Sequence, residues 1–470
     1  MSGPAAGRLH APLIAAWDHY WFGGIAAVRP YLLVKVLLCV LAFDGWLHRV
    51  PAGGQYGAGG FGVAHFQWLD ALQPLPSPGL YVGLMLAVGL LALWCAFTNA
   101  GRWPRALLAV LYTYAWAMSF QDGFQHHYFL SLVLMTFVFF PRLRARDLFA
   151  IDAEPAVGRR RRARPAGTLT VSSWGYALLG VNIGIVYAYT AVTKWDTEWR
   201  AGGVLRGLGG ASLGPIAAWL AGVGVPPGML WAMQGLGVFA LECLIAAGFA
   251  LAVVLDQRRR PWLRTITWLA FLGAVSFHVL TEVALPLQIG WFSYYMIVLA
   301  CVYLLPSSLL WKLGALVYRP ATRLAAVGQD ALGRARLRGI GLTSVAVIGA
   351  AGVVVASGRA LDLPGAQTVS VLAASALVAA SVILLVRRRP QVAFRHALAT
   401  GLAAVLMWAA AGRSGILFLY HARVGVDLQR RGDSSAALGA FERARRYAPN
   451  AKALDNYMAR LKRQLDRAEE

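Results

Sequence analysis

The sequence predicts an all-α polytopic integral membrane protein, a helical bundle of about eleven transmembrane helices with a small helical hairpin at its C-terminus. Hydrophobic residues make up 58% of the 470 residues, and charged residues make up 14%. Apolar runs of about 18 to 25 residues recur along the chain, and each is long enough to cross a bilayer core about 30 Å thick. Arginines gather between these runs, where they determine membrane topology.

The predicted spans follow the apolar runs. They lie at about 31–48, 79–97, 104–120, 126–140, 174–193, 229–255, 263–282, 288–306, 339–357, 368–386 and 395–412. Between 194 and 228 the chain is rich in glycine and proline and only partly apolar. We expect a re-entrant or interfacial segment there.

Basic residues alternate from loop to loop. Every loop between an even-numbered span and the next odd-numbered span is rich in arginine, and the remaining loops are not. The positive-inside rule places the arginine-rich loops and the N-terminus in the cytoplasm. An odd number of spans then places the C-terminus outside, so we expect a multi-pass protein of the cell (inner) membrane. Most of the basic residues lie in such clusters between apolar runs, so the net charge of +23 does not by itself indicate nucleic acid, and no nucleic-acid partner is expected.

Composition suggests how the chain is divided. We expect an N-terminal cytoplasmic segment at 1–30 and a membrane domain at 31–318 that resembles a family described below. A basic cytoplasmic linker at 319–338, three additional transmembrane helices at 339–412 and a helical tail at 413–470 should follow.

The tail contains a pattern of small and apolar residues that matches one tetratricopeptide repeat, a helical hairpin of about 34 residues. The matching positions within 418–451 are Gly425, Leu428, Gly432, Ala437, Phe441, Ala444 and Pro449. A single repeat cannot bury its own apolar face. The hairpin must therefore pack on the helix expected at 454–467, on the membrane domain, or on a periplasmic or extracellular protein or peptide partner.

Lys194 stands at the end of the apolar run 174–193, and acids and tryptophans follow it directly. Two interpretations are open. A lysine beside tryptophan can anchor the end of a span in the lipid headgroup layer. A partly buried lysine can instead act as a base, although Asp196 and Glu198 favour its charged form if they lie close to it.

Ionisable residues gather at one membrane face in the predicted topology. At or near the outer ends of spans lie Asp44, Asp122, His126, His127, Lys194, His278 and Glu282. Charged groups within a membrane are costly and tend to be paired or functional, so the cluster predicts an outward-facing site. Structural roles are the alternative, with the histidines as solvated or core residues and Asp44 as a helix-packing residue. The spacing matches no short metal-ligand motif, and no metal is expected.

The segment around Lys194 resembles a known family. YAYTAVTKWDTEW is similar to the Y-x-x-A-G-x-x-K-L-x-x-x-W segment of the vitamin K-dependent gamma-carboxylases and of bacterial proteins that share their HTTM (horizontally transferred transmembrane) domain. Further segments resemble the family in the same order along residues of about 20–315. They are LVKVLLCVLAFD at 33–44, FQHHYFLSLVL at 124–134 and FHVLTEVALPLQIGWFSYYMIVLACVYLLP at 277–306.

The resemblance implies roles for individual residues. Lys194 corresponds to the catalytic base, and His126 to the histidine implicated beside it. The matched motifs suggest substrate-binding roles for Asp44, Trp199, His278, Ile289, Gly290, Phe292 and Tyr294. The implied substrate is reduced vitamin K or another hydroquinone, with O2 and CO2 as co-substrates.

The implied activity is oxygen-dependent epoxidation of the quinone, driven by lysine and coupled in this family to glutamate carboxylation. A buried lysine suits this chemistry, because a desolvated amine can take a proton. In the eukaryotic enzyme a large lumenal β-rich domain, which holds the peptide substrate, follows the membrane domain, whereas here three more spans and a helical hairpin follow. The resemblance therefore implies quinone chemistry more strongly than it implies a peptide substrate. The alternative is a non-catalytic bundle that binds a lipid or a protein, with the repeat-like tail as an adaptor.

Overall fold

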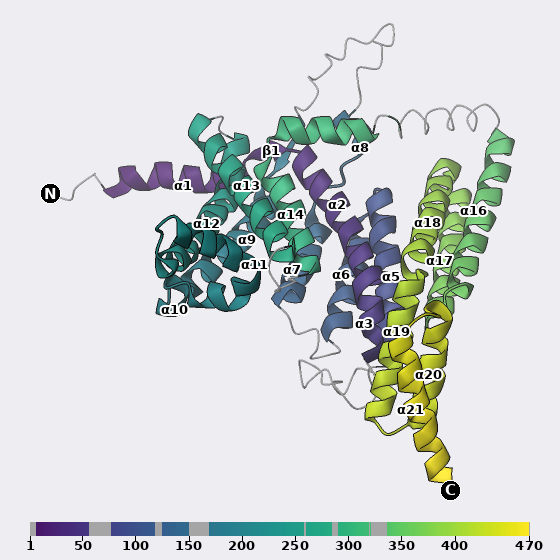
Figure 1. Ribbon diagram of the computed structural model, residues 1–470. Helices are drawn as coiled ribbons and strands as arrows, with labels where there is room; N and C mark the ends of the chain where they lie inside the picture. Colours follow the sequence, from purple (N-terminus) through teal and green to yellow (C-terminus); the bar gives the residue numbers. More distant parts are fainter. Residues whose placement is uncertain are drawn as a thin grey trace. The chain divides into compact units, whose positions relative to one another are not determined.

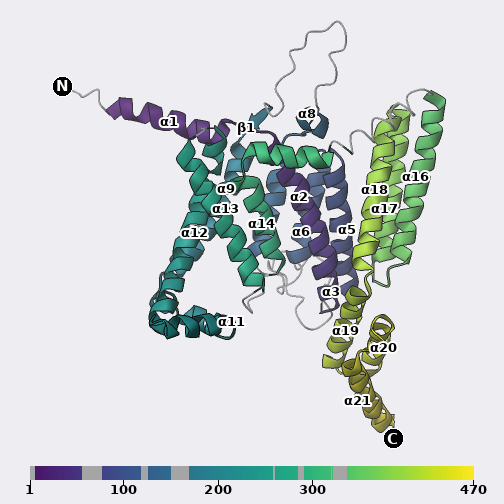
Figure 2. The same ribbon diagram turned by 45° about the horizontal axis from the view of Figure 1, so that its top comes forward.

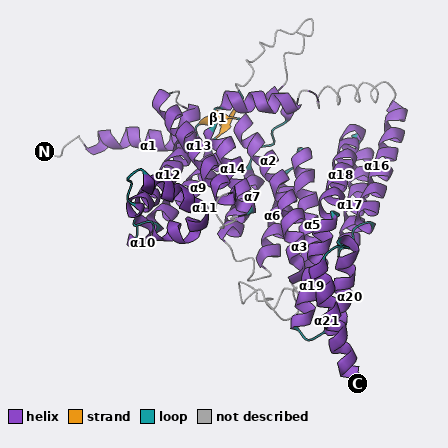
Figure 3. Cartoon of the chain, viewed as in Figure 1, coloured by secondary structure: helices purple, strands orange, loops and turns teal. Residues whose placement is uncertain are grey.

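A computed structural model describes residues 6–55, 77–117, 125–149, 169–257, 260–283, 290–318, 320 and 336–469. The described residues are almost entirely helical, as Figure 3 shows, and the predicted all-α class is confirmed. The contacts divide the chain into two units, which are described separately. Unit 1 comprises Met1–Leu37 and Phe139–Arg323, and unit 2 comprises Leu38–Val138 and Leu324–Glu470.

Figure 1 labels the helices of unit 1. They are α1 (Ala6–Phe22), α8 (Ala145–Phe149), α9 (Trp174–Thr193), α10 (Thr197–Arg200), α11 (Gly203–Gly222), α12 (Pro227–Gln257), α13 (Pro261–Val283) and α14 (Trp291–Leu304). In this unit α12 packs against both α9 and α13, and α13 packs against α14. These long helices form the framework of the site described below.

Helices α10 and α11 occupy the stretch expected to be re-entrant or interfacial. Gly202 introduces α11 with a left-handed backbone, φ 74°, and a side chain there would meet the carbonyl oxygen of Trp231 at 2.1 Å. Glycine therefore permits the close approach of this turn to α12. Figure 2 shows α11 running across the end of α12. Leu205, Ala217 and Trp231 form the buried contact between these two helices.

Two short strands, unpredicted from the sequence, tie the beginning of the chain to the beginning of α9. Strand β1 (Gly24–Ala26) pairs antiparallel with β2 (Thr170–Ser172), with Ile25 opposite Val171. The pairing continues where the Ala27 amide donates to the carbonyl of Leu169 at 2.9 Å.

Arg29 is fully buried and holds the end of α14. Its guanidinium donates to the carbonyls of Val302, Tyr303 and Leu305 at 2.7, 3.0 and 3.0 Å. The last carbonyls of a helix lack partners within the helix and carry partial negative charge. The Arg29 guanidinium supplies both the missing donors and a positive charge. After α14 the chain turns by 115° into the helix Ser307–Tyr318.

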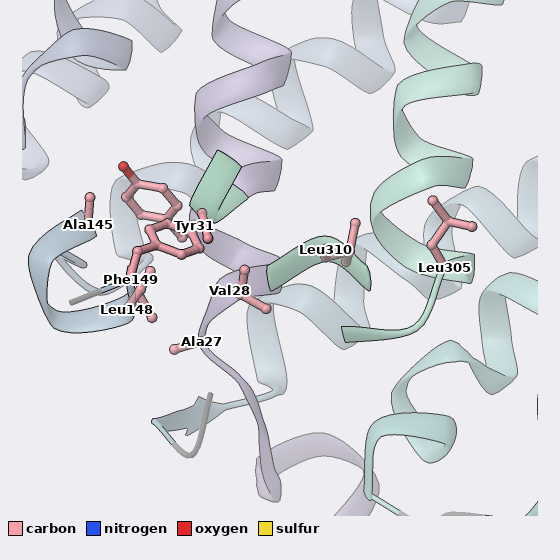
Figure 4. Packing of buried hydrophobic residues seen from close by; sticks show 9 residues of the cluster. Ala27, Val28, Tyr31, Ala145, Leu148, Phe149, Leu305 and Leu310 are labelled. Carbon is pink, nitrogen blue, oxygen red and sulfur yellow. The ribbon is translucent and has the colours of Figure 1, made fainter. Parts of the chain in front are cut away.

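An apolar cluster surrounds this turn (Figure 4). Tyr31 packs edge-on against Phe149, with ring centroids 5.8 Å apart, and Leu305 and Leu310 belong to the same cluster. Its buried members come from three segments that are distant in the sequence, 27–31, 145–149 and 305–315.

Unit 2 contains the remaining membrane helices and the tail. Helix α2 (Val28–Asp44) begins in unit 1 and enters unit 2 at Leu38. The others are η1 (Gly45–Arg49), α3 (Val50–Ala52), η2 (Gly53–Gln55), α5 (Pro78–Phe97), α6 (Arg102–Ala117), α7 (Gln125–Phe139), α16 (Arg336–Arg359), α17 (Ala366–Val386) and α18 (Pro390–Ala411). Helices α16, α17 and α18 pack against one another, and α18 also contacts α5.

The tail forms helices α19 (Ser414–Arg430), α20 (Ser434–Tyr447) and α21 (Lys452–Glu469). The aromatic ring of Phe441 lies where a side chain on Gly425 would stand, at 2.6 Å from its ideal Cβ position. Leu454, Met458 and Leu461 of α21 cover the apolar face of the hairpin. The expected packing on the following helix is therefore present, while the assignment to tetratricopeptide repeats stays a prediction.

The span count differs from the prediction. A helix overlaps each predicted span, but by length and hydropathy eight described helices can cross a membrane, or nine if the bent pair Trp291–Leu304 and Ser307–Tyr318 is one span. In the described part of the chain α6 and α7 have 16 and 15 residues, fewer than the roughly 20 that a crossing needs, and residues 118–124 between them lie outside the described residues. The count of about eleven is not confirmed, and neither are the topology and domain boundaries that rest on it.

Candidate functional site

Lys194 forms a buried ion pair with Glu242. It is the first residue beyond α9, and its Nζ donates to the two carboxylate oxygens at 2.7 and 3.0 Å. A third hydrogen bond, of 3.3 Å, runs back to the carbonyl of Thr190. The side chains of Lys194 and Glu242 are only 16% and 3% exposed. The predicted base is thus held on the flank of α9 in a largely dry position.

Small residues make this pair possible. Side chains on Gly180 and Gly184 would meet carbonyl oxygens of α12 at 3.2 and 3.1 Å, those of Phe249 and Ala246. Close approach of helices through small residues is usual in membranes. It brings the middle of α12, where Glu242 lies, within reach of the end of α9.

The acids next to Lys194 in the sequence serve other purposes. Asp196 accepts a hydrogen bond from the Trp199 amide at 2.7 Å and so begins α10, while Glu198 is exposed. The carboxylate opposite Lys194 is that of Glu242. The predicted participant Trp199 does lie close, with its ring centroid 5.2 Å from Nζ, a distance typical of a cation–π contact.

A second set of hydrogen-bonded polar side chains begins two turns before Lys194 on α9. Tyr187 and His278 are hydrogen-bonded through the phenolic oxygen and Nε2 at 2.6 Å, and both are buried. The other ring nitrogen of His278 lies 3.3 Å from the hydroxyl oxygen of Ser293 on α14. Ser293 donates to Glu282 at 2.8 Å. Helices α9, α13 and α14 are therefore linked by an unbroken series of polar contacts.

Of the predicted substrate-binding residues at the start of α14, some contact the His278 network and one does not. The Gly290 amide donates to Glu282 at 2.7 Å, and the Phe292 ring meets His278 edge-on at 6.1 Å. Tyr294 is 51% exposed and packs on Trp291 instead. Ile289 lies outside the described residues.

His126 and Asp44 belong to a separate cluster in unit 2. Arg49 joins them, with Nη2 3.0 Å from His126 Nε2 and Nε 3.7 Å from Asp44 Oδ1. The neighbouring His127 is buried and lies 2.8 Å from the Tyr112 hydroxyl. Lys194 and His126 are in different units, so their union in one catalytic site stays a prediction.

Several residues of these clusters escape sequence reasoning. Glu242 is the only charged residue between Pro227 and Leu255, and a lone acid in a span is a recognisable signal. Tyr187 is the first residue of the matched lysine segment, although no role was assigned to it, whereas Ser293 carries no signal because serine is common in membrane helices. In the described part of the chain no group of three or more His, Cys, Asp or Glu side chains is arranged to hold a metal ion.

Comparison with known proteins agrees with the resemblance found in the sequence. No solved structure matches the chain. The family model of the HTTM domain matches residues 37–307, more than half of the chain. The match covers both clusters described above. Together with the apolar helices it makes this a multi-pass membrane protein. The chain therefore belongs to the HTTM domain family.

Proposed function

We propose that this protein is a membrane-embedded enzyme of the vitamin K-dependent gamma-carboxylase-like class, in which Lys194 deprotonates a reduced quinone for oxygen-dependent epoxidation. The observation that carries the proposal is the buried Lys194–Glu242 pair at the end of α9. Two further facts support it: HTTM domains are found in vitamin K-dependent carboxylase-related proteins, and Lys194 lies in the segment that resembles the family's lysine segment. Glutamate carboxylation is the coupled step that the resemblance suggests.

Glu242 gives Lys194 a way to become a base. An ammonium group cannot accept a proton, so Lys194 must first release one. The nearest acceptor is the Glu242 carboxylate at 2.7 Å. Burial removes water from both charges, and this desolvation cost reduces the advantage of the charged pair over a neutral amine and carboxylic acid. Transfer of one proton between the two side chains then exposes a neutral amine to the substrate.

The surroundings suit an aromatic, lipid-soluble substrate. The Trp199 ring lies beside Lys194 Nζ, and the Trp195 ring packs on Phe239 at 4.7 Å. Flat rings of this kind stack favourably on a quinone ring. A site with little water also protects a strongly basic oxygen intermediate from being quenched.

The test is an assay of membranes that contain the protein, supplied with vitamin K hydroquinone and oxygen. Epoxide should form in the wild type and in the control Lys312→Ala, whose lysine is exposed on another helix. Lys194→Ala should reduce the rate by at least about a hundredfold, the usual contribution of a general base. An equal rate in Lys194→Ala, or no epoxide from the wild type, would refute the proposal.

A second variant separates catalysis from packing. Lys194→Arg keeps a positive charge opposite Glu242, but a guanidinium group stays protonated and cannot act as a base. We expect this variant to be folded and inactive. If Lys194 only joined α9 to α12, or only anchored the helix at the membrane surface, Lys194→Arg would be as active as the wild type.

A further inference from the structure

The hydrogen bonds from Tyr187 to Glu282 run in one direction. Ser293 donates to the Glu282 carboxylate, so its oxygen is free to accept from His278 Nδ1. His278 then carries its proton on Nδ1 when neutral, which leaves Nε2 as an acceptor. The Tyr187 hydroxyl is the donor to Nε2. Each group donates to the next, from buried Tyr187 to partly exposed Glu282.

This series begins beside the ion pair. Tyr187 precedes Lys194 by seven residues, which places both on one face of α9 about 10 Å apart along the axis. The hydrogen bond of Nζ to the Thr190 carbonyl shows that Lys194 folds back toward Tyr187 by one turn. The Tyr187 hydroxyl and the Lys194 side chain thus lie along one side of the helix.

The proposed reaction releases two protons from its substrate. Hydroquinone and O2 give quinone epoxide and water, so both O–H bonds of the hydroquinone break and both of its oxygens become carbonyls. One atom of O2 becomes the epoxide oxygen, and the other leaves as water once the groups that accepted the two protons have returned them. Lys194 can take only one of these protons. The second needs another acceptor, and the two hydroxyls lie at opposite ends of the ring.

We propose that Tyr187, His278, Ser293 and Glu282 form a relay that takes the second hydroxyl proton of the hydroquinone. This inference rests on the proposed function. Tyr187 passes its proton to His278 Nε2, the Nδ1 proton moves to Ser293, and the Ser293 proton moves to the Glu282 carboxylate. The tyrosinate left behind accepts the substrate proton, so one proton enters at Tyr187 and one arrives at Glu282.

A purely structural network would give different results. The relay predicts that Tyr187→Phe, which keeps the ring and its packing, lowers the turnover number for epoxide by at least about tenfold with little change in KM, since acid–base groups contribute about 10² to 10⁴ to rate. The control Tyr189→Phe removes an exposed hydroxyl from the same helix and should be neutral. His278→Ala should be inactive and should regain activity with added imidazole. A structural histidine would show no such rescue.

The outcomes separate this inference from the proposed function. An active wild type and inactive Lys194→Ala, together with full activity in Tyr187→Phe and His278→Ala, would overturn the relay alone. An inactive wild type would overturn both. A spectroscopic test needs no turnover: the nitrogen NMR signals of His278, identified by their loss in His278→Gln, should show the proton on Nδ1. A proton on Nε2 would reverse the first hydrogen bond and overturn the relay.

Discussion

The Lys194–Glu242 pair makes a quantitative prediction about stability. Replacing one member leaves the other buried without a counter-charge, whereas replacing both with apolar residues of similar size removes the problem. Lys194→Met leaves Glu242, which is only 3% exposed, and should cost about 3 to 4 kcal/mol of unfolding free energy. Glu242→Leu leaves Lys194, whose 16% exposure offers its ammonium some water, and should cost about 2 kcal/mol. The double variant should lie within about 1 kcal/mol of the wild type.

The measurement is denaturant unfolding of the purified protein in mild detergent, followed by tryptophan fluorescence. The two losses would sum to about 5 to 6 kcal/mol if the residues acted independently, and the double variant should lose at most about 1 kcal/mol, so the expected coupling free energy is at least about 4 kcal/mol. The matched control is the cycle of Lys194→Met with Glu198→Leu, since Glu198 is exposed and should show no coupling. Additive losses in the Lys194–Glu242 cycle would show that the pair contributes no mutual stabilisation, and the reasoning above would fail.

Three further predictions concern other parts of the molecule. Arg29→Lys should lower the melting temperature, because an ammonium group cannot reproduce the planar fork that reaches the carbonyls at the end of α14. Gly425→Ala should destabilise the tail by about 1 to 3 kcal/mol through its clash with the Phe441 ring, while the control Gly439→Ala, with open space around it, should be neutral or stabilising in the same unfolding assay. The third prediction concerns His421. Burial lowers the pKa of His421 below the ordinary 6.5, and this effect is larger than the opposing effect of the nearby Asp362 carboxylate. His421 is therefore protonated more readily in the unfolded tail than in the folded tail. Docking of the tail should therefore weaken as the pH falls below about 6.5, seen as faster amide exchange in α19, and His421→Gln should abolish that dependence; amide exchange that slows on acidification would contradict it.

The sequence predicts most of the helices, because a helix that crosses the apolar core of a bilayer needs a continuous run of about 20 apolar residues. The run 174–193 coincides with α9, and the prediction that Lys194 ends it is confirmed. The strands β1 and β2 are missed because three residues are too few to show a period.

The partners of the site residues are harder to predict. Lys194 is followed by two acids within four residues, yet its carboxylate comes from Glu242, 48 residues away. The local sequence does not show which acid pairs with Lys194, because the packing of α12 against α9 determines which carboxylate lies within reach of the ammonium group. The resemblance identified Lys194 and His278 individually, and its lysine segment begins at Tyr187. The hydrogen bond that joins Tyr187 to His278 became visible only in three dimensions.

The contact made by Arg29 has a consequence for biosynthesis. A ribosome completes the chain in order, and Arg29 emerges early, whereas its carbonyl partner on Val302 follows 273 residues later. Until then the guanidinium lacks the carbonyls of Val302, Tyr303 and Leu305, which supply three of its hydrogen bonds in the folded protein. The first helices therefore cannot settle into their final positions as they are inserted. Unit 1 closes only after α14 has been synthesised, so a chain truncated before Val302 should be left open and accessible to quality-control proteases.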